Sequence, residues 1–210
     1  MKILNLYAGI GGNRKLWKGD IQVTAVEDNI DIFSIYRDNF PEDRLILDDA
    51  HEYLLGHYKE FDFIWSSPPC PSHGRSRYWG SKTDKKQVNY PSPIYPDMSL
   101  YQEIIFLKHF FKGKWIVENV NPYYTPLIPA KCIQRHLFWS NFDVSDKEFN
   151  GEKIRTAQIP QLQEMHGFDL SKYKLKNKRQ ILRNCVLPKL GLHIFNCSSK
   201  VRQEVLEVLV

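Results

Sequence analysis

The stretch Ile3–Gly12, which reads ILNLYAGIGG, joins a short apolar run to a turn with three glycines. An apolar run of about five residues that ends in a glycine turn is typical of a buried strand. Residues 13–18 then predict a short helix, so the chain begins as strand, turn and helix. Glycine has no Cβ, which lets the backbone turn tightly and approach a ligand closely at Gly9, Gly11 and Gly12.

The turn differs from the dinucleotide-binding fingerprint, because Arg14 stands where the third glycine of that fingerprint would be. Glu27 follows the next apolar run, residues 21–26, at about the distance where an acidic side chain binds ribose hydroxyls in nucleotide folds. Together these features favour a nucleoside cofactor and do not require a pyrophosphate. A glycine turn with a purely structural role is the alternative.

Strand and helix patterns alternate along the first half of the chain. The strand patterns lie at residues 3–7, 21–26, 44–47, 61–65 and 114–117, and the helical patterns at 31–39 and 100–111. This alternation predicts an α/β fold with a mostly parallel sheet and helices on both faces. Such sheets bind ligands beyond the carboxyl ends of their strands, so we expect one crevice to collect the polar residues that follow the strands.

Two strand ends carry candidate catalytic groups. In Pro68-Pro69-Cys70, two prolines fix φ and stiffen the turn, which holds the thiol in place. A rigidly held thiol suits nucleophilic catalysis if neighbouring positive charge, such as His73 or Arg75, lowers its pKa from about 8.5. A small buried cysteine beside structural prolines is the alternative. Glu118 also follows a strand, where a carboxylate by itself is usually a helix cap or an ion-pair partner.

The composition is that of a globular protein whose charge favours a polyanionic partner, although a balance of this size is also common among proteins that bind no nucleic acid. The 210 residues, 42% of them hydrophobic and 25% charged, fit one domain. The net charge is +5, and five basic residues share one polar stretch with two aromatic ones: Arg75, Arg77, Tyr78, Trp79, Lys82, Lys85 and Lys86. That combination suits phosphate contact and base stacking, with a solvated loop as the alternative.

The same composition argues against several other classes. No apolar run approaches the roughly 20 residues that span a bilayer, and the first residues lead into a strand rather than a signal peptide, so we expect a cytoplasmic protein. The four cysteines have no CxxC spacing, which leaves a zinc site and a dense disulfide framework without support. We therefore expect no metal ion and no membrane partner.

Several segments resemble, in order, the motifs of the DNA cytosine-5 methyltransferases. Leu6–Gly12 resembles the first, cofactor-binding motif, Pro68–Cys70 the nucleophile motif, and Glu118–Val120 the glutamate motif. Gln134–Trp139 is similar to the motif whose arginines grip the flipped nucleotide, and Gln180–Pro188 to the final motif. The resemblance covers nearly the whole chain and looks closest to the small members that bacteriophages carry.

This resemblance implies a fold and a reaction. The expected fold is the Rossmann-like fold of class I S-adenosylmethionine methyltransferases, as a single domain over residues 1–210. The expected reaction transfers the methyl group of S-adenosylmethionine to carbon 5 of cytosine in DNA and leaves S-adenosylhomocysteine. Cys70 would be the covalent nucleophile, Glu118 would hold the base, and Arg135 would steady the base or its phosphate. A phage-encoded enzyme would act in the cytoplasm of the bacterial host.

The resemblance also implies two sets of binding residues. The cofactor set is Tyr7, Ala8, Gly9, Gly11, Gly12, Glu27, Asp28, Asp49, Pro69, Leu100 and Asn184. The nucleic-acid set is Ser72, His73, Arg75, Arg77 and Asn119. No residue is assigned to a metal.

The chain departs from the family pattern at several positions. Pro71 follows the catalytic cysteine where many relatives have glutamine, and Arg183 replaces the usual glycine before Asn184. The arginine motif retains only Arg135, with His136 beside it. Residues 141–157 are all that stands where larger relatives have a target-recognition region, so we expect a short or degenerate target unless a partner protein reads the sequence.

Two other functions remain open on the sequence. The tRNA-methylating branch resembles the DNA enzymes in these same motifs. A catalytically silent DNA-binding protein on the same fold is a more distant alternative, and the presence of both Cys70 and Glu118 argues against it.

Overall fold

The computed structural model describes residues 1–74, 95–149, 154 and 156–199, and within them one sheet has the strand order β3-β2-β1-β4-β5-β7-β6. The strands are β1 (Lys2–Leu6), β2 (Gln22–Glu27), β3 (Arg44–Leu47), β4 (Phe63–Ser66), β5 (Lys114–Val120), β6 (Lys131–Ile133) and β7 (His136–Ser140). Strands β1 to β5 are parallel to one another. Strand β7 is antiparallel to both β5 and β6, so the sheet ends in a hairpin.

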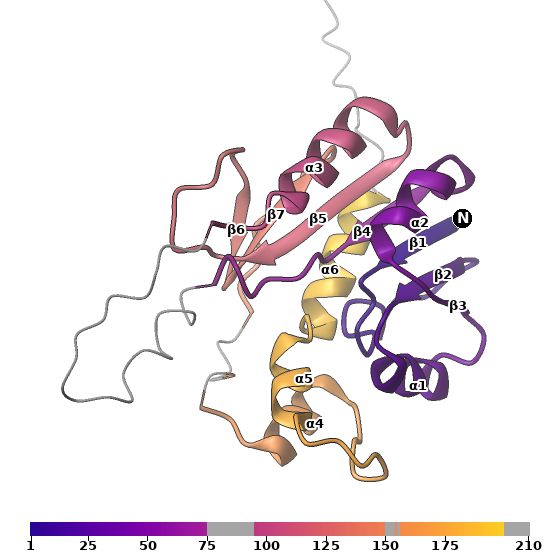
Figure 1. Cartoon of the computed structure of the whole chain (residues 1–210), viewed down its shortest axis with the longest axis vertical. Coiled ribbons are helices and arrows are strands. Elements are labelled where there is room, and N and C mark those ends of the chain that lie inside the picture. Colours follow the sequence, from indigo (N-terminus) through magenta and orange to yellow (C-terminus); the bar gives the residue numbers. More distant parts are fainter. Residues whose placement is uncertain (75–94, 150–153, 155, 200–210) are drawn as a thin grey trace, which may run out of the picture.

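Helices cover both faces of this sheet (Figure 1). The helices are α1 (Ile30–Asn39), α2 (Ala50–His57), α3 (Ser99–Phe110), α4 (Ile159–His166), α5 (Lys178–Asn184) and α6 (Pro188–Ser198), with a 3-10 turn at Tyr58–Glu60. Helices α2 and α3 pack on one face in a common apolar cluster. Helix α6 packs on the other face, and α1, α4 and α5 form a further cluster beside it.

The alternation of side chains along β1, which reads KILNL, shows why Ile3, Leu4 and Leu6 are all apolar. Leu4 and Leu6 are buried against α2 and α3, whereas Ile3 is buried against α6. A strand that is covered on both faces buries successive residues on opposite sides, so it reads as a continuous apolar run. The expected α/β architecture, a Rossmann-like, mostly parallel sheet with helices on both faces, is confirmed.

The strand order also fixes where a ligand can bind. Along the chain the sheet grows outwards from β1 through β2 to β3, and then returns to the other side of β1 with β4 and β5. The connections that leave the carboxyl ends of β1 and β4 therefore run in opposite directions, to β2 and to β5. Such a topological switch point is where open α/β sheets form their binding crevice.

The helix expected at residues 13–18 is absent, and this prediction was wrong. Residues 12–16 form turns instead. The Arg14 guanidinium bonds to the Asp43 carboxylate at 2.9 and 3.0 Å, while the Trp17 ring stacks on Phe195 of α6 at 5.0 Å between centroids. A segment this short gains little from helical hydrogen bonds, so side-chain packing determines its path.

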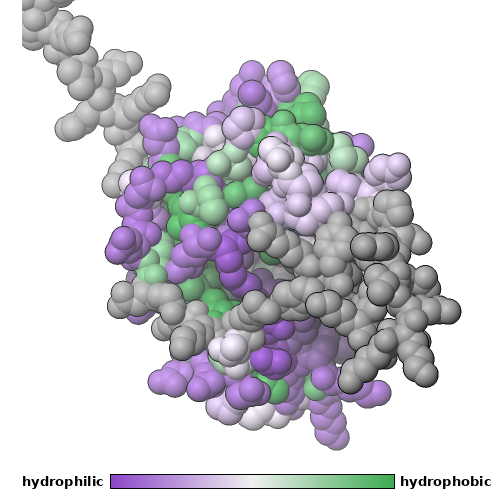
Figure 2. Space-filling model, turned by 90° about the vertical axis from the view of Figure 1, so that its left-hand side faces the viewer, coloured by the Kyte–Doolittle hydropathy of each residue, from purple (hydrophilic) through white to green (hydrophobic). Residues whose placement is uncertain are grey.

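On the face shown in Figure 2, the described residues form small hydrophobic patches that hydrophilic side chains separate. Scattered exposed apolar side chains of this kind are normal on a globular protein. None of the helices in the described ranges is both long and apolar enough to cross a bilayer.

Candidate active site

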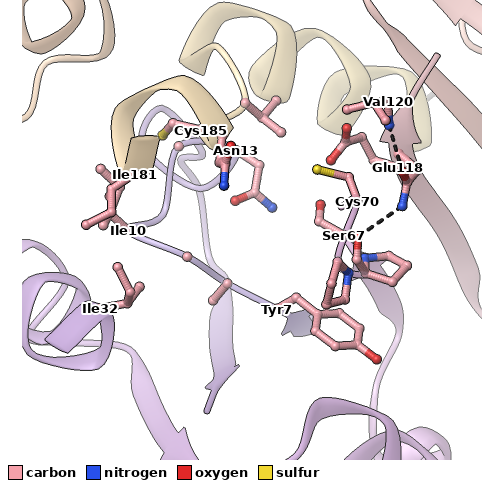
Figure 3. A pocket seen from close by; sticks show the side chains of 18 of the residues that line it. Tyr7, Ile10, Asn13, Ile32, Ser67, Cys70, Glu118, Val120, Ile181 and Cys185 are labelled. Carbon is pink, nitrogen blue, oxygen red and sulfur yellow. Dashed lines mark hydrogen bonds between the residues drawn. The ribbon is translucent and has the colours of Figure 1, made fainter. Parts of the chain in front are cut away.

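A cavity of about 340 Å³ opens beyond the carboxyl ends of β1, β2, β4 and β5 (Figure 3). Its lining combines the glycine turn, the end of β2, the turn after β4, the end of β5 and the region that joins α5 to α6. The expected crevice at the strand ends is therefore present. Ile10, Ile32 and Ile181 lie towards one side of it, and Cys70 and Glu118 towards the other (Figure 3).

The glycine turn follows β1 with backbone angles that favour glycine. Gly9 has φ of +56° and Gly11 φ of +85°, in the left-handed region where a Cβ is unfavourable. A Cβ on Gly12 would lie 2.2 Å from the Cys185 sulfur and 2.4 Å from the Val186 carbonyl oxygen. Gly12 is thus required for close packing of the turn against the start of the α5–α6 connection, whereas a Cβ on Gly9 would meet no atom within 4 Å.

Glu27 fixes the shape of this turn from the end of β2. Its Oε2 accepts from the Gly9 amide at 2.9 Å, and its Oε1 accepts from the Asn29 amide at 3.1 Å. Burial raises the pKa of Glu27, and these two hydrogen bonds offset part of that rise. The side chain is buried yet lines the cavity, so it can also accept from a ligand hydroxyl.

Tyr7 forms another part of the lining and is held by a buried acid. The Tyr7 hydroxyl donates to Glu103 Oε1 at 2.5 Å, and Ser66 Oγ donates to the other oxygen of Glu103 at 2.5 Å. Burial raises the pKa of both Tyr7 and Glu103. The phenol therefore stays neutral, and its ring is fixed beside the turn that carries Cys70 (Figure 3).

Cys70 sits in a turn that several backbone bonds stiffen. The amides of His73 and Gly74 donate to the Cys70 carbonyl oxygen at 3.0 and 3.1 Å. Burial raises the pKa of the Cys70 thiol, the negative charge of Glu118 raises it further, and the positive charge of Arg135 offsets only part of this. The neutral thiol is therefore favoured.

Glu118 faces Cys70 from β5 and is paired with a histidine. Its carboxylate contacts His136 Nδ1. Burial by itself raises the pKa of Glu118, but the charge and hydrogen bond of His136, the hydrogen bond of Ser67 and the charge of Arg135 outweigh it, and the net pKa is lowered.

Arg135 completes this side of the cavity. Its Nη2 donates to the Arg183 carbonyl oxygen at 2.7 Å, which ties the β6–β7 hairpin to α5. Burial lowers the pKa of Arg135, while Glu118 and Cys70 favour its charged form. The guanidinium is thus the fixed positive charge beside both candidate catalytic groups.

The structure brings most of the expected residues together. The expected residues that line the cavity are Tyr7, Ala8, Gly9, Gly12, Glu27, Asp28, Pro69, Cys70, Glu118, Asn119, Arg135 and Asn184.

Five expected residues lie outside this lining. Gly11 packs towards Phe40, Leu100 lies in the apolar core, and the Asp49 carboxylate caps α2 through the Glu52 amide. Ser72 Oγ accepts from the Asp97 amide at 2.9 Å, and His73 is buried with Nδ1 2.6 Å from the Tyr124 hydroxyl. Arg75 and Arg77 lie outside the described residues.

Several lining residues were not expected from the sequence. They are Ile10, Asn13, Ile32, Ala50, Ser67, Pro68, Pro71, Val120, His136, Ile181, Arg183, Cys185 and Val186. His136 and Arg183 carried a signal, because each departs from the family pattern within a motif. Ile10 and Ile181 lie within such motifs, whereas Ile32 carried no signal, because an apolar residue in a helix is indistinguishable in sequence from a core residue. Among the described residues, no group of three or more histidine, cysteine or acidic side chains is arranged to hold a metal ion.

Comparison with known proteins adds one relative of defined activity. No protein-family model matches the chain. The tRNA (cytosine(38)-C(5))-methyltransferase of Spodoptera frugiperda is 39% identical over 96 residues, which cover 42% of this chain and 29% of that protein. This chain is similar to a cytosine-5 methyltransferase. It spans less than a third of the length of this relative, at 29%.

Solved structures overlap with the chain only in part. A multiply substituted variant of Spodoptera frugiperda DNMT2 is 28% identical with a TM-score of 0.39, over 57% of this chain and 35% of the other. A SAM-dependent methyltransferase from Agrobacterium tumefaciens is 14% identical with a TM-score of 0.39, over 60% of this chain and 40% of the other. These superpositions decide neither substrate nor reaction.

Proposed function

We propose that this chain methylates carbon 5 of cytosine in a nucleic acid, with S-adenosylmethionine as methyl donor and Cys70 as covalent nucleophile. One observation carries the proposal: the Cys70 thiol and the Glu118 carboxylate line the same cavity as the glycine turn and Glu27. The similarity of 96 residues to a tRNA cytosine-5 methyltransferase supports the same reaction. A catalytically silent binding protein would have no need to keep both reactive groups in one cavity.

The lining residues fit the adenosyl part of S-adenosylmethionine. Ile10, Ile32 and Ile181 offer an apolar surface for adenine, and Glu27 offers a carboxylate for the ribose hydroxyls. Gly9 leaves open space where a side chain would stand, so the ligand can approach the backbone there. When bound, S-adenosylmethionine supplies an electrophilic methyl group beside the reacting base.

Cys70 would make carbon 5 reactive enough to take that methyl group. Carbon 5 of cytosine is a poor nucleophile, and covalent addition divides the reaction into easier steps. The Cys70 thiolate forms a bond to carbon 6, and the displaced electron pair of the ring raises the electron density at carbon 5. After methylation, the proton on carbon 5 is removed and the sulfur–carbon 6 bond breaks, which restores the thiolate.

Glu118 and Arg135 would stabilise the charge that this addition creates. Glu118 binds the exocyclic amine and the ring nitrogen N3, where negative charge develops. Arg135 steadies the base or its phosphate from the neighbouring hairpin. The base cannot reach Cys70 from within a duplex, so it must be flipped out or presented in a single strand.

The proposal has two forms, which differ in the substrate. In the first form the substrate is DNA, and in the second it is tRNA. The motifs resemble the DNA enzymes, and the basic composition suits either polymer. The similarity to a tRNA methyltransferase is the specific observation that favours the second form.

A methyl-transfer assay tests both forms of the proposal. The protein is incubated with labelled S-adenosylmethionine and, in separate reactions, with duplex DNA, single-stranded DNA and tRNA, and modified bases are mapped at single-base resolution. Label on carbon 5 of cytosine supports the proposal, and the polymer that carries it decides the substrate. Label on adenine, on another atom or on no polymer would contradict it.

The target is proposed to be short or degenerate. Residues 141–157 form only a short segment where larger relatives have a target-recognition region. Discrimination between sequences needs side chains that reach base edges, and each such direct contact is worth roughly 1–3 kcal/mol. A partner protein could supply the missing contacts. Mapping should then show methylation at a motif of about four base pairs or fewer for the protein alone. A long, strictly recognised site would contradict this part of the proposal.

A further inference from the structure

The register between β5 and β7 brings Glu118 and His136 together. The two strands are antiparallel, with Val120 opposite His136 and Glu118 opposite Phe138. Residues opposite each other in such a pair share a face of the sheet, so Glu118 and His136 are diagonal neighbours on one face. Both side chains are long enough to bridge the diagonal, and His136 Nδ1 contacts Glu118 Oε1.

The pair is buried but opens on the cavity. Glu118 is 7% exposed and His136 is 4% exposed, and both line the cavity beside Cys70. Although burial opposes ionisation of Glu118, the charge and hydrogen bond of His136 lead the groups that lower its pKa. In the protein by itself, the anionic form of Glu118 is therefore favoured.

This charge state conflicts with what the proposed reaction needs from Glu118. The ring nitrogen N3 of cytosine carries a lone pair and accepts hydrogen bonds, whereas an ionised carboxylate can only accept. Two acceptors that face each other in a buried site are unfavourable. Glu118 must therefore gain a proton when the base binds, and His136 is already in contact with its carboxylate.

We propose that His136 is a positioning residue that stores this proton for Glu118. When cytosine binds, the proton passes from Nδ1 of His136 to the carboxylate of Glu118, and the neutral acid donates to N3. The imidazole becomes neutral in the same step. When the sulfur–carbon 6 bond breaks and the base leaves, the proton returns to His136. This inference rests on the proposed cytosine chemistry and assigns His136 a role within it.

Other titratable and charged groups face the pair from the neighbouring elements. Cys70 faces Glu118 from the turn after β4, and Arg135 faces both from the β6–β7 hairpin. Arg183 and Cys185 at the end of α5 face Arg135. A guanidinium stays charged at all physiological pH values, and the Cys70 thiol is itself the nucleophile. Among these groups, an imidazole is the one suited to hold and release a proton near neutral pH.

The experiment follows exchange of tritium from carbon 5 of cytosine in the substrate nucleic acid, without cofactor. Reversible addition of Cys70 lets carbon 5 take a proton from water, and the label is then lost to solvent. In wild type, the exchange rate should rise with pH as Cys70 ionises, and then fall as the His136–Glu118 pair loses its shared proton.

The His136→Arg variant distinguishes two roles of His136: storing a proton and supplying only a positive charge. The guanidinium keeps the charge beside Glu118 but releases no proton, so exchange should drop at least about tenfold and the alkaline fall should disappear. His57→Arg is the matched control, because His57 Nδ1 contacts Glu60 Oε1 at 2.7 Å on the exposed end of α2, away from the cavity. That control should exchange at the wild-type rate.

Exchange by His136→Arg within about twofold of wild type, with the same pH profile, would overturn the inference. If this variant does not fold, His136→Gln keeps a hydrogen-bond donor and removes the titrating group. In His136→Gln, the pH at which the exchange rate falls should then shift, because Glu118 must hold its proton without a titrating partner. An unchanged pH for this fall would overturn the inference. Absence of exchange and of methylation in wild type would instead overturn the proposed function.

Discussion

The side chain of Asn119 joins the end of β5 to the turn that carries Cys70. Its Nδ2 donates to the Pro68 carbonyl oxygen at 3.0 Å, and its Oδ1 accepts from the Val120 amide at 2.9 Å. The residue is 2% exposed, so these bonds are made away from water. Asn119 was expected to contact nucleic acid; in the structure its side chain holds the turn that carries Cys70 against the end of the strand that carries Glu118.

Replacement of Asn119 by alanine should therefore reduce kcat more than it weakens nucleic-acid binding. Loss of the amide leaves the Pro68 carbonyl without its donor, which costs about 1–3 kcal/mol in the free energy of unfolding. Asn141→Ala is the matched control, because Asn141 also bridges two backbone groups, Gly113 O and Trp115 N, but lies outside the cavity lining. Steady-state kinetics should show a kcat loss in Asn119→Ala alone. Chemical denaturation should show the smaller loss of stability in Asn141→Ala, because Asn141 is exposed to water. Equal kcat in the two variants would make Asn119 merely structural.

Replacement of Cys70 by serine should abolish methylation and leave cofactor binding largely intact. The thiol is needed for addition to carbon 6, whereas the residues proposed for the adenosyl group lie elsewhere in the lining. Calorimetry with S-adenosylhomocysteine measures binding, and labelled methyl transfer measures activity. Cys132→Ser, at an exposed thiol, should retain full activity. Methylation by Cys70→Ser above about a thousandth of the wild-type rate would remove Cys70 from the role of nucleophile.

The pH dependence of Cys70 reactivity should reveal the charge of Glu118. Burial is the first cause of the raised pKa of Cys70, and the negative charge of Glu118 is the second. Glu118→Gln removes that charge, so the pKa should fall and more thiolate should be present at a given pH below it. Iodoacetamide should then alkylate Cys70 faster in Glu118→Gln than in wild type at about pH 7–8, although the variant is catalytically impaired. The exposed Cys132 serves as the internal control, since its alkylation should not change. A slower reaction of Cys70 in the variant would show that Glu118 does not act on the thiol in this way.

Substitution of Gly12 by alanine should destabilise the protein and weaken cofactor binding. The new methyl group would lie 2.2 Å from the Cys185 sulfur and 2.4 Å from the Val186 carbonyl oxygen, so the glycine turn and the α5–α6 connection must separate. Overpacking of this kind costs about 1–3 kcal/mol. Gly56→Ala is the control: it lies in α2 with nothing within 4 Å of its Cβ position, and it should stabilise by roughly 0.5–1 kcal/mol. Thermal unfolding distinguishes the two, and a Gly12→Ala variant as stable as wild type would contradict the close contact.

The sequence was sufficient for the parallel core of the fold. The run at Ile3–Leu6 and the helix at Ile30–Asn39 follow from local patterns, because the strand is apolar on both faces and Asn29 caps the helix through its side chain. Helix α2 went unnoticed because it is short, and its apolar stripe is weak in an eight-residue segment.

Residues that act through tertiary contacts were less accessible to sequence reasoning. The nucleophile and the glutamate stand in recognisable motifs, but the pairing of Glu118 with His136 depends on the antiparallel register of β5 and β7. A one-residue shift of that register would turn His136 to the other face. Family position assigned Asp49 and Leu100 to the cofactor, and sequence alone did not show that the Asp49 carboxylate caps α2 or that Leu100 lies in the apolar core.

Covalent trapping tests the central claim most directly. DNA and tRNA that carry 5-fluorocytosine are incubated with the protein and S-adenosylmethionine, and the products are analysed by denaturing electrophoresis and peptide mass spectrometry. Fluorine cannot leave carbon 5 as a proton does, so an active enzyme that uses covalent addition remains attached to the base. The account predicts a denaturant-stable adduct on the peptide that contains Cys70, with the methyl group already transferred. No adduct from a protein that methylates the unmodified polymer, or an adduct on any other residue, would contradict it.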